Sequence, residues 1–547
     1  MWGRDAGTIN GIKIDNLHYL NQEFFNGIKN MNTLFATSEK KRTWAEAVRA
    51  FFHPRVIAML FLGFSAGVPI LLIFSTLSVW LREADVARST IGFFSWAALG
   101  YGFKFVWAPL VDKMPLPLLA RVLGQRRSWL LLSQMAIMAA LCFMALSEPT
   151  TSLTAIAVGA VALGFSSATQ DIVIDAYRIE AASKELQGLM SATYIAGYRL
   201  GMVVAGAGAL ELAGFLDVVD GYDPNSWRLT YFAMATVMLV GVVTTFVINE
   251  PERKNANDIN LQTMNDYMRF LGVFVVAASA FVSVFFISAD WAVSSKATLG
   301  TNAILNAELA GFLVEAFRLL CGVGAGAIAA WALVAFKFIP KKMISETYLA
   351  PFTDFFNRYG KSALIVIALI ATYRIADVVM GVMANVFYVD LGYEKQEIGR
   401  ITKLFGLTMT IAGGFLGGVL TVRYGVMKIL FLGAVLAGAT NLLFSLLAGI
   451  GPNLWALAGV ISADNLSAGI ASAAFVAYLS SLTSTSFTAT QYALFSSIMV
   501  LLPKLIAGYS GMMVENVGYS VFFIGTAVVG ILPLTLIVLS ARIRARE

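Results

Sequence analysis

Histidine and cysteine are nearly absent from the sequence, and charged residues are scarce. Only 13% of the 547 residues are charged, whereas about a quarter are charged in an ordinary soluble domain. The two cysteines, Cys142 and Cys321, lie in apolar stretches, which excludes a disulfide framework and predicts two small buried side chains. Because His18 and His53 both precede the first long apolar run, any proton chemistry inside a membrane must use Asp, Glu, Lys, Arg or Tyr.

The sequence also lacks the patterns of ATP-driven pumps and of enzymes. It has no phosphate-binding loop, no metal-ligand cluster and no nucleophile–base pair, so we expect no enzyme, no cofactor and no metal. The glycines of CGVGAGAIAA at 321–330 follow no strand and favour close helix packing instead. The net charge of +6 does not indicate nucleic acid, because excess Lys and Arg mark the cytoplasmic loops of membrane proteins.

Long apolar runs fill most of the chain. Hydrophobic residues make up 58% of it, and many windows of about 18–25 residues are long enough to cross a bilayer as helices. The alternation typical of a transmembrane barrel is absent, which predicts an all-α polytopic membrane protein. About fourteen spans are predicted, at 55–81, 89–111, 128–147, 152–177, 187–214, 228–248, 270–290, 307–336, 362–389, 397–420, 427–449, 453–481, 489–514 and 519–541.

A weak internal repeat divides the spans into two halves. STIGFFS at 89–95 is similar to QEIGRIT at 396–402, and VIDAY at 173–177 is similar to FVAY at 475–478. Two parallel six-helix halves are the plan of major facilitator transporters. The predicted domains are an N-terminal extension with an amphipathic helix (1–54), a six-helix bundle (55–248), a linker (249–269), two inserted spans (270–336), a linker (337–360), a second six-helix bundle (361–541) and a tail (542–547).

The basic residues predict how the chain is oriented. With the N-terminus in the cytoplasm, most loop Lys and Arg fall on the cytoplasmic side, and the acidic loop at 217–223 falls outside. Both termini are therefore predicted to be cytoplasmic. The stretch 43–53 has the pattern of a short amphipathic helix on the membrane surface.

Several segments carry a resemblance to a known family. TIGFFS, FKFVWAPLVDK, GQRRSW, SSATQDIVIDAYRIE and GYRLGMV, with TSFTATQYALFSS in the second half, resemble the AmpG-type muropeptide permeases. The resemblance runs from about residue 52 to about residue 540, and it includes the two extra helices between the halves. The polar N-terminal extension departs from the family pattern.

This resemblance implies a function. The family imports N-acetylglucosaminyl-1,6-anhydro-N-acetylmuramyl peptides from the periplasm across the inner membrane of Gram-negative bacteria. The import depends on protons, serves cell-wall recycling and indirectly leads to β-lactamase induction. The implied partners are thus an anionic muropeptide, protons and the lipid bilayer.

One predicted set of site residues lies in the loop after the second span. Asp112 is followed, after an insertion, by Arg126 and Arg127, and the second half has Arg423 but Val422 in place of the acid. In facilitator transporters, such residues lock the cytoplasmic side through carboxylate–guanidinium pairs. Alternatively, the basic residues only set the topology.

A second set combines acids and bases at the end of the fourth span. Asp171 and Asp175 are spaced i, i+4, and Arg178 follows three residues later, so all three share one helix face. They could pair with Lys104 of the second span. Three interpretations stay open: a gate of ion pairs, a proton carrier in which burial and the like-charged neighbour act on one acid, or a static network at the helix end.

A third set consists of cations deep in predicted spans. Arg199, Arg374 and Lys504 are unfavourable there without anions, and Asp377 can neutralise only one of them. They therefore predict an anionic solute, unless each pairs with an acid of the protein. In the inserted spans, Glu315 and Arg318 are predicted to pair with each other.

Neutral polar groups at similar depth are candidates for contacts with sugar rings and peptide groups. A buried amide needs hydrogen-bond partners, and tyrosine rings and hydroxyls can stack on sugars or bond them. The candidates are Gln170, Tyr101, Tyr198 and Tyr373. Packing alone would also explain the tyrosines.

Two other functions remain open at this point. A facilitator-type transporter could carry another bulky anion, such as a coenzyme A ester or a siderophore. Some facilitator relatives are instead non-transporting assembly proteins, but such a protein has no need for several cations at one depth.

Overall fold

The computed structural model describes residues 8–9, 12–13, 44–87, 90–91, 94, 99–181, 183, 186–218, 222–252, 264–300, 307–507 and 509–544. Within these ranges the chain is almost entirely helical, apart from the short strands β1 (Thr8–Ile9) and β2 (Ile12–Lys13). The all-α fold class is therefore confirmed. The predicted helix at 43–53 appears from Trp44 onwards as α2 (Trp44–Arg49) and a 3-10 turn (Ala50–Phe52).

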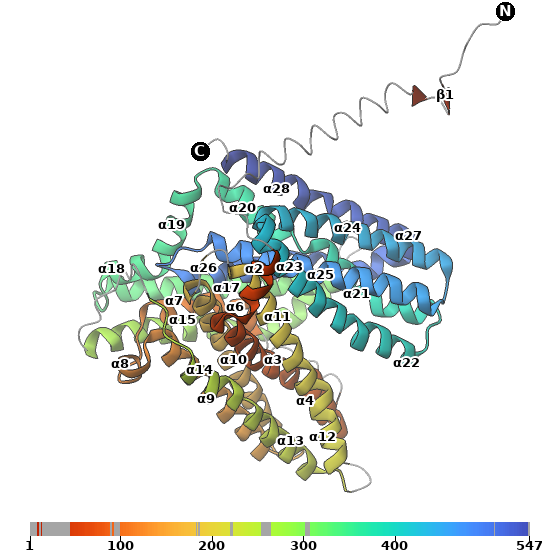
Figure 1. Ribbon diagram of the computed structural model, residues 1–547. Coiled ribbons are helices and arrows are strands. Elements are labelled where there is room, and N and C mark those ends of the chain that lie inside the picture. The colour runs from red at the N-terminus through yellow and green to blue at the C-terminus, as the bar shows by residue number, and fades with distance from the viewer. Residues whose placement is uncertain are drawn as a thin grey trace, which may run out of the picture.

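The helices form two groups, one from each half of the chain (Figure 1). The N-terminal group comprises α3 (Pro54–Ile73), α4 (Ser75–Glu83), α6 (Leu99–Phe103), a 3-10 turn (Lys104–Val106), α7 (Ala108–Lys113), α8 (Leu119–Leu123), α9 (Gln125–Leu146), α10 (Leu153–Ala181), α11 (Gln187–Val203), a π-helical turn (Val204–Gly208), α12 (Ala209–Leu216), α13 (Pro224–Val237) and α14 (Leu239–Val247). The C-terminal group comprises α20 (Ser362–Thr372), α21 (Ile375–Asp390), α22 (Lys395–Ile398), a π-helical turn (Gly399–Phe405), α23 (Gly406–Tyr424), α24 (Val426–Ile450), α25 (Leu454–Leu482), α26 (Thr488–Ala507), α27 (Ser510–Val529) and α28 (Ile531–Arg544).

Twelve helices of the described residues are long and apolar enough to cross a membrane. The predicted span 89–111 falls partly outside the described residues. The last two predicted spans meet near Gly518, whose φ of +75° interrupts α27, while the apolar stretch Ser510–Arg542 is one of the twelve. The count of fourteen therefore stays a prediction.

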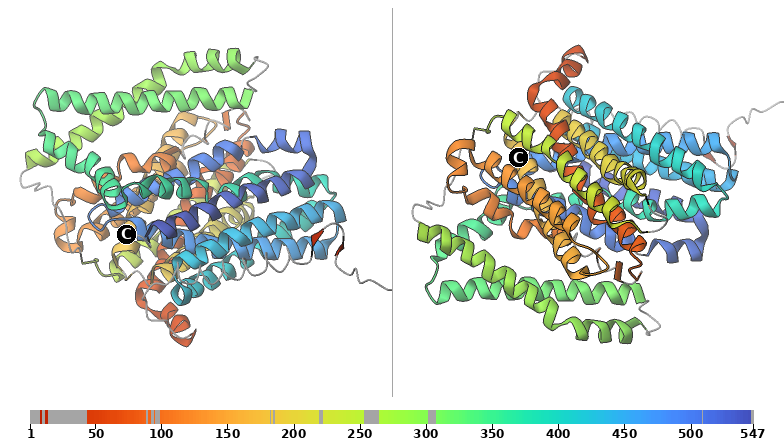
Figure 2. Two further views of the ribbon diagram at one scale, coloured as in Figure 1. Left: turned by 90° about the horizontal axis from the view of Figure 1, so that it is seen from above. Right: turned by 90° about the horizontal axis from the view of Figure 1, so that it is seen from below.

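The inserted helices lie at one edge of the molecule (Figure 2). They are α15 (Met264–Ile287), α16 (Ala289–Gly300) and α17 (Ala307–Ala335), followed by α18 (Lys341–Ile344), a π-helical turn (Ser345–Leu349) and α19 (Ala350–Tyr359). The predicted pair is confirmed, since Arg318 Nη1 lies 3.0 Å from Glu315 Oε1. Lys296 Nζ is a further partner of Glu315, at 2.5 Å.

The prediction of two buried cysteines is wrong for Cys321 and holds only in part for Cys142. Cys142 is half-buried, whereas Cys321, on α17, is exposed. The inserted helices are mostly uncovered by the rest of the protein, so an apolar side chain there faces outward, as lipid-facing side chains do.

The two groups meet at one end and diverge at the other. One end of the molecule, where α3 and α11 begin and α10 ends, is called the near face. The opposite end, with α12 and α22, is called the far face. In Figure 1 the two groups are joined near α10, α11, α23 and α26, and they diverge toward α12 and α22. At the near face, Gly188 of α11 meets Thr421 of α23 so closely that an added Cβ would lie 2.9 Å from the Thr421 side chain.

Glycines fix α11 against α3. Gly197 and Gly201 on α11 face the α3 backbone, and an added Cβ at Gly197 would lie only 1.9 Å from the carbonyl oxygen of Leu60. Such small residues, four apart, let two backbones touch. Because this face of α11 is committed to α3, the intervening Tyr198 and Arg199 occupy other faces of the helix.

Replacing Gly197 with alanine is expected to destabilise the protein by about 1–3 kcal/mol, because the new methyl group has no room beside Leu60. The matched control is Gly214→Ala on α12, where an added Cβ meets nothing within 4 Å. Thermal unfolding of the purified proteins in detergent measures both. Equal melting temperatures for the two variants would contradict the close approach of α3 and α11.

Candidate functional site

Asp112 joins the two groups of helices at the near face. Its carboxylate accepts hydrogen bonds from the backbone N–H of Ala489 (3.0 Å) and of Thr490 (2.7 Å), and from the Thr490 hydroxyl (2.7 Å). These residues open α26, where backbone N–H groups have no partner within the helix and favour a negative charge. An acid of the N-terminal group thus caps a helix of the C-terminal group.

Arg126 holds this acid within its own group. Its fully buried guanidinium lies 2.8 Å from Asp112 Oδ1 and 2.6 Å from Glu180 Oε1. Burial raises the pKa of Asp112, but the charge of Arg126 and the hydrogen bonds from Arg126 and Thr490 outweigh it, so that the pKa lies below its usual value. Asp112 is therefore ionised throughout the neutral range.

Arg127 bonds within its own group, and Arg423 lies beside an aromatic ring of its own helix. Arg127 donates from Nε to the Thr245 carbonyl oxygen (2.9 Å) and from Nη2 to that of Phe246 (3.0 Å), which satisfies the last carbonyl groups of α14. Arg423, at the end of α23, lies 5.5 Å from the centre of the Tyr424 ring. Of the predicted set, the structure therefore brings Asp112 and Arg126 together.

Arg178 is a second link between the groups. Its fully buried guanidinium donates to Ser480 on α25 (2.7 Å) and lies 5.0 Å from the ring centre of Tyr492 on α26. Within its own group it donates to Ser191 (3.0 Å) and pairs with Asp175 (3.1 Å). The ion pairs of Arg126 and Arg178 lie within the N-terminal group, whereas the contacts of Asp112 and Arg178 with the C-terminal group use hydroxyl groups, backbone N–H groups and an aromatic ring.

Asp171 and Asp175 have different surroundings although they are one helical turn apart. Asp175 lies 3.1 Å from Arg178 and 3.5 Å from Lys104 Nζ. Asp171 is buried in the same way, but its Oδ1 atom has no hydrogen-bond partner among the described residues. The negative charge of Asp175 is thus balanced by two cations in contact with it, whereas one carboxylate oxygen of Asp171 has no hydrogen-bond donor among the described residues.

The neutral polar residues predicted to contact the substrate differ in whether the protein supplies their hydrogen-bond partners. The hydroxyl of Tyr101 donates to Ser167 (2.6 Å), and that of Tyr373 donates to the Leu430 carbonyl oxygen (3.0 Å) while its ring stacks on Phe475. Gln170 is fully buried, and within the described part of the chain neither side-chain polar atom has a partner.

Four charged residues, one from the N-terminal group and three from the C-terminal group, interact electrostatically one with the next. Arg199 of α11 and Arg374, which precedes α21, act electrostatically on each other, although they belong to different groups. Arg374 Nε lies 4.0 Å from Asp377 Oδ2. Asp377 in turn acts on Asp464 of α25. We call Arg199, Arg374, Asp377 and Asp464 the charge row.

Asp464 was not among the predicted site residues. The sequence alone nevertheless gave a reason to include it. Asp464 is an acid about 15 Å into a predicted span, where an ionisable residue is a functional candidate by default. In the structure it is half-buried and accepts a hydrogen bond from the Thr440 hydroxyl at 3.3 Å. The described residues provide no cation in ion-pair contact with it.

The third predicted cation, Lys504, lies on α26 after Pro503. Its side chain is exposed, and the described residues offer it no ion pair. Tyr198, beside Arg199, is half-buried and packs against the Tyr194 ring.

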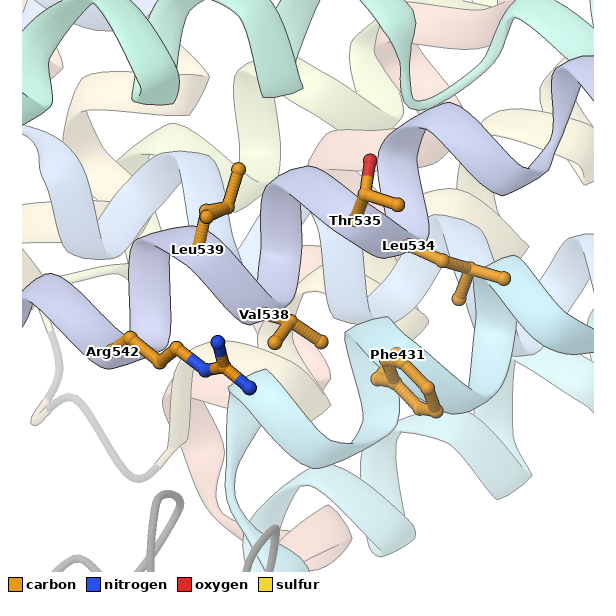
Figure 3. Close-up of a pocket in the computed structure, with 6 residues that line it drawn as sticks. All are labelled: Phe431, Leu534, Thr535, Val538, Leu539 and Arg542. Carbon is orange, nitrogen blue, oxygen red and sulfur yellow. The ribbon is translucent and has the colours of Figure 1, made fainter. Parts of the chain in front are cut away.

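The surface hollows are separate from these residues. Figure 3 shows the hollow between α24 and α28, lined by Phe431, Leu534, Thr535, Val538, Leu539 and Arg542. Its lining is mainly apolar, as expected for a surface in contact with lipid. It contains none of the predicted site residues.

Comparisons with known proteins identify the family. The chain is 30% identical over 485 residues to the "Putative transporter AmpG 4" of Rickettsia conorii, covering 88% of this chain and 95% of the relative. The chain belongs to the AmpG family. It is also 28% identical over 481 residues to the anhydromuropeptide permease of Escherichia coli K12, covering 88% and 78% of the two chains. The Major Facilitator Superfamily model matches residues 103–353.

Solved structures of major facilitator transporters have a similar fold at low sequence identity. The fucose transporter FucP in its outward conformation aligns with a TM-score of 0.56 at 11% identity, covering 90% of this chain and 99% of FucP. The proton:xylose symporter XylE aligns with a TM-score of 0.53, also at 11% identity, covering 90% and 95%. The fold is that of major facilitator transporters, and the AmpG-family relatives make this multi-pass protein a transporter rather than an enzyme.

Proposed function

We propose that this transporter imports anhydromuropeptides from the periplasm to the cytoplasm of a Gram-negative cell, driven by protons. The observation that carries the proposal is the electrostatic interaction between Arg199 and Arg374, which belong to different groups of helices. Two like charges at mid-depth repel each other unless an anion lies between them. A muropeptide provides carboxylates for this position, and the name of the E. coli relative points to the same substrate class.

The near face would be the cytoplasmic gate. With the N-terminus in the cytoplasm, the contacts of Asp112 with α26 and of Arg178 with α25 close the inner side. The helices that diverge toward the far face would then admit substrate from the periplasm (Figure 1). Import requires the near-face contacts to open while those at the far face close.

The proton would bind at Asp171, and Asp175 would belong to the gate. Asp175 already has two cations beside it, whereas Asp171 has a buried oxygen with no partner. A carboxylate that lacks compensation gains more from a proton than one that has it. Asp112 is unsuited to carry protons, because its lowered pKa keeps it ionised at any cytoplasmic or periplasmic pH.

Uptake of labelled anhydromuropeptide into right-side-out vesicles tests the proposal. An acidic exterior should drive accumulation, and a protonophore should abolish it. Arg199→Gln should raise KM by about 10–100-fold, because it removes one charge-assisted contact to the substrate. Gly214→Ala is a control outside the site. Uptake of a coenzyme A ester or a siderophore, but not of the muropeptide, would show that the substrate is another anion. Uptake that is unchanged by the protonophore would exclude proton coupling.

A further inference from the structure

The charge row leaves opposite charges unneutralised at its two ends. Arg374 and Asp377 are three residues apart and face each other at 4.0 Å. In the part of the chain that the structure describes, Arg199 makes only a weak contact with Met202 Sδ (3.9 Å), and Asp464 has only the neutral Thr440 hydroxyl as partner. The cation Arg199 and the anion Asp464 are thus available to bind charged groups of a ligand.

The order of the row is also directional. At about 1.5 Å per residue, Arg199 and Arg374 lie about 18 Å from the near-face ends of α11 and α20, and Asp464 lies about 15 Å from the far-face end of α25. Since α25 is 29 residues long, the unpaired acid is nearer the far face than the two arginines. The positive end of the row thus lies closer to the near face than the negative end does.

We propose that the charge row binds a zwitterionic part of the substrate, with a carboxylate against Arg199 and Arg374 and a primary ammonium group against Asp464. The inference rests on the proposed function and narrows its substrate class. A peptide stem that ends in a diamino acid carries both groups, whereas the anhydro-disaccharide alone has no ammonium group. Guanidinium groups match carboxylates, and a carboxylate accepts hydrogen bonds from the N–H groups of an ammonium.

The middle pair of the charge row is held in place and is also partly exposed. Arg374 is held by Ser472 (3.1 Å) as well as by Asp377, and it lies at the interruption between α20 and α21. Side chains of Arg374 and Asp377 retain 31% and 20% of their exposure. Arg199 is exposed and Asp464 is half-buried, so all four residues of the row remain accessible, as a ligand site requires.

The test uses two labelled anhydromuropeptides that differ only in the acetylation of the free amine. In vesicles with the unaltered transporter, we expect the KM of the free amine to be about tenfold lower, the effect of one charge-assisted contact. Asp464→Asn should remove this preference, and Asp464→Glu should restore part of it. Asp390→Asn is the matched control, since this acid bonds Tyr519 outside the row.

The outcomes separate the inference from the proposed function. Uptake of both compounds with equal KM by the unaltered protein would overturn the inference and leave the muropeptide importer in place. Uptake of neither compound would overturn both. If Asp464→Asn abolished uptake of both compounds equally while melting at the same temperature as the unaltered protein, Asp464 would act on protons and the ammonium assignment would be wrong.

Discussion

Replacing Arg126 with alanine is expected to lower the free energy of unfolding by about 3–5 kcal/mol, because removal of one partner leaves buried charges without compensation. Arg126 is fully buried, and its guanidinium bonds Asp112, Glu180 and the Val111 carbonyl oxygen. Without it, two carboxylates would remain in a dry site beside each other. Denaturant unfolding of the purified protein in detergent, followed by tryptophan fluorescence, measures the change.

Arg121→Ala is the matched control for this variant. Arg121 belongs to the same loop region, on α8, and is exposed, so its loss should change the stability by less than about 0.5 kcal/mol. Arg126→Lys keeps the charge but cannot reach all three partners with one ammonium group, so an intermediate loss is expected. If Arg126→Ala were as stable as Arg121→Ala, the network around Asp112 would not contribute to folding.

Replacing Asp171 with asparagine is expected to abolish accumulation driven by a pH gradient while leaving substrate binding and exchange. The amide resembles a permanently protonated carboxyl group, so the proposed proton site could no longer be emptied. Accumulation should fall at least about tenfold, corresponding to about 1.4 kcal/mol of lost coupling. Accumulation with an acidic exterior and counterflow without a gradient are measured in the same vesicles.

Asp175→Asn should behave differently. It leaves Arg178 and Lys104 without their acid and so weakens the near-face contacts, while the proton site at Asp171 persists. We expect slower transport that still depends on the pH gradient. Full gradient-driven accumulation by Asp171→Asn would exclude this residue as the carrier, and loss of gradient dependence only in Asp175→Asn would exchange the roles of the two acids.

The sequence predicted contacts that depend on short spacing within a helix. The pairs Asp175–Arg178 and Glu315–Arg318 follow from the i, i+3 geometry of a helix, and both are present. The all-α fold follows equally from the length of the apolar runs. Such inferences need only local geometry, which the sequence contains.

Contacts between distant parts of the chain could not be predicted in this way. The bonds between Asp112 and α26 join residues 377 and 378 positions apart, and no local pattern specifies which helix start an acid will meet. Glu180 was visible beside the predicted acids, but its pairing with Arg126 depends on how α9 and α10 pack. The distinction between Asp171 and Asp175 likewise depends on where Lys104 lies.

Two ion pairs of the near face can persist when the two groups of helices part there. Asp112 would exchange the N–H groups of Ala489 and Thr490 for water while it keeps Arg126, and Arg178 would release the Ser480 hydroxyl while it keeps Asp175. A helix cap contributes only about 0.5–2 kcal/mol, so the loss of this cap adds little to the free energy of opening. We therefore expect later steps, such as reorientation of the loaded helices or release of the substrate, to limit the rate of transport rather than the loss of these contacts.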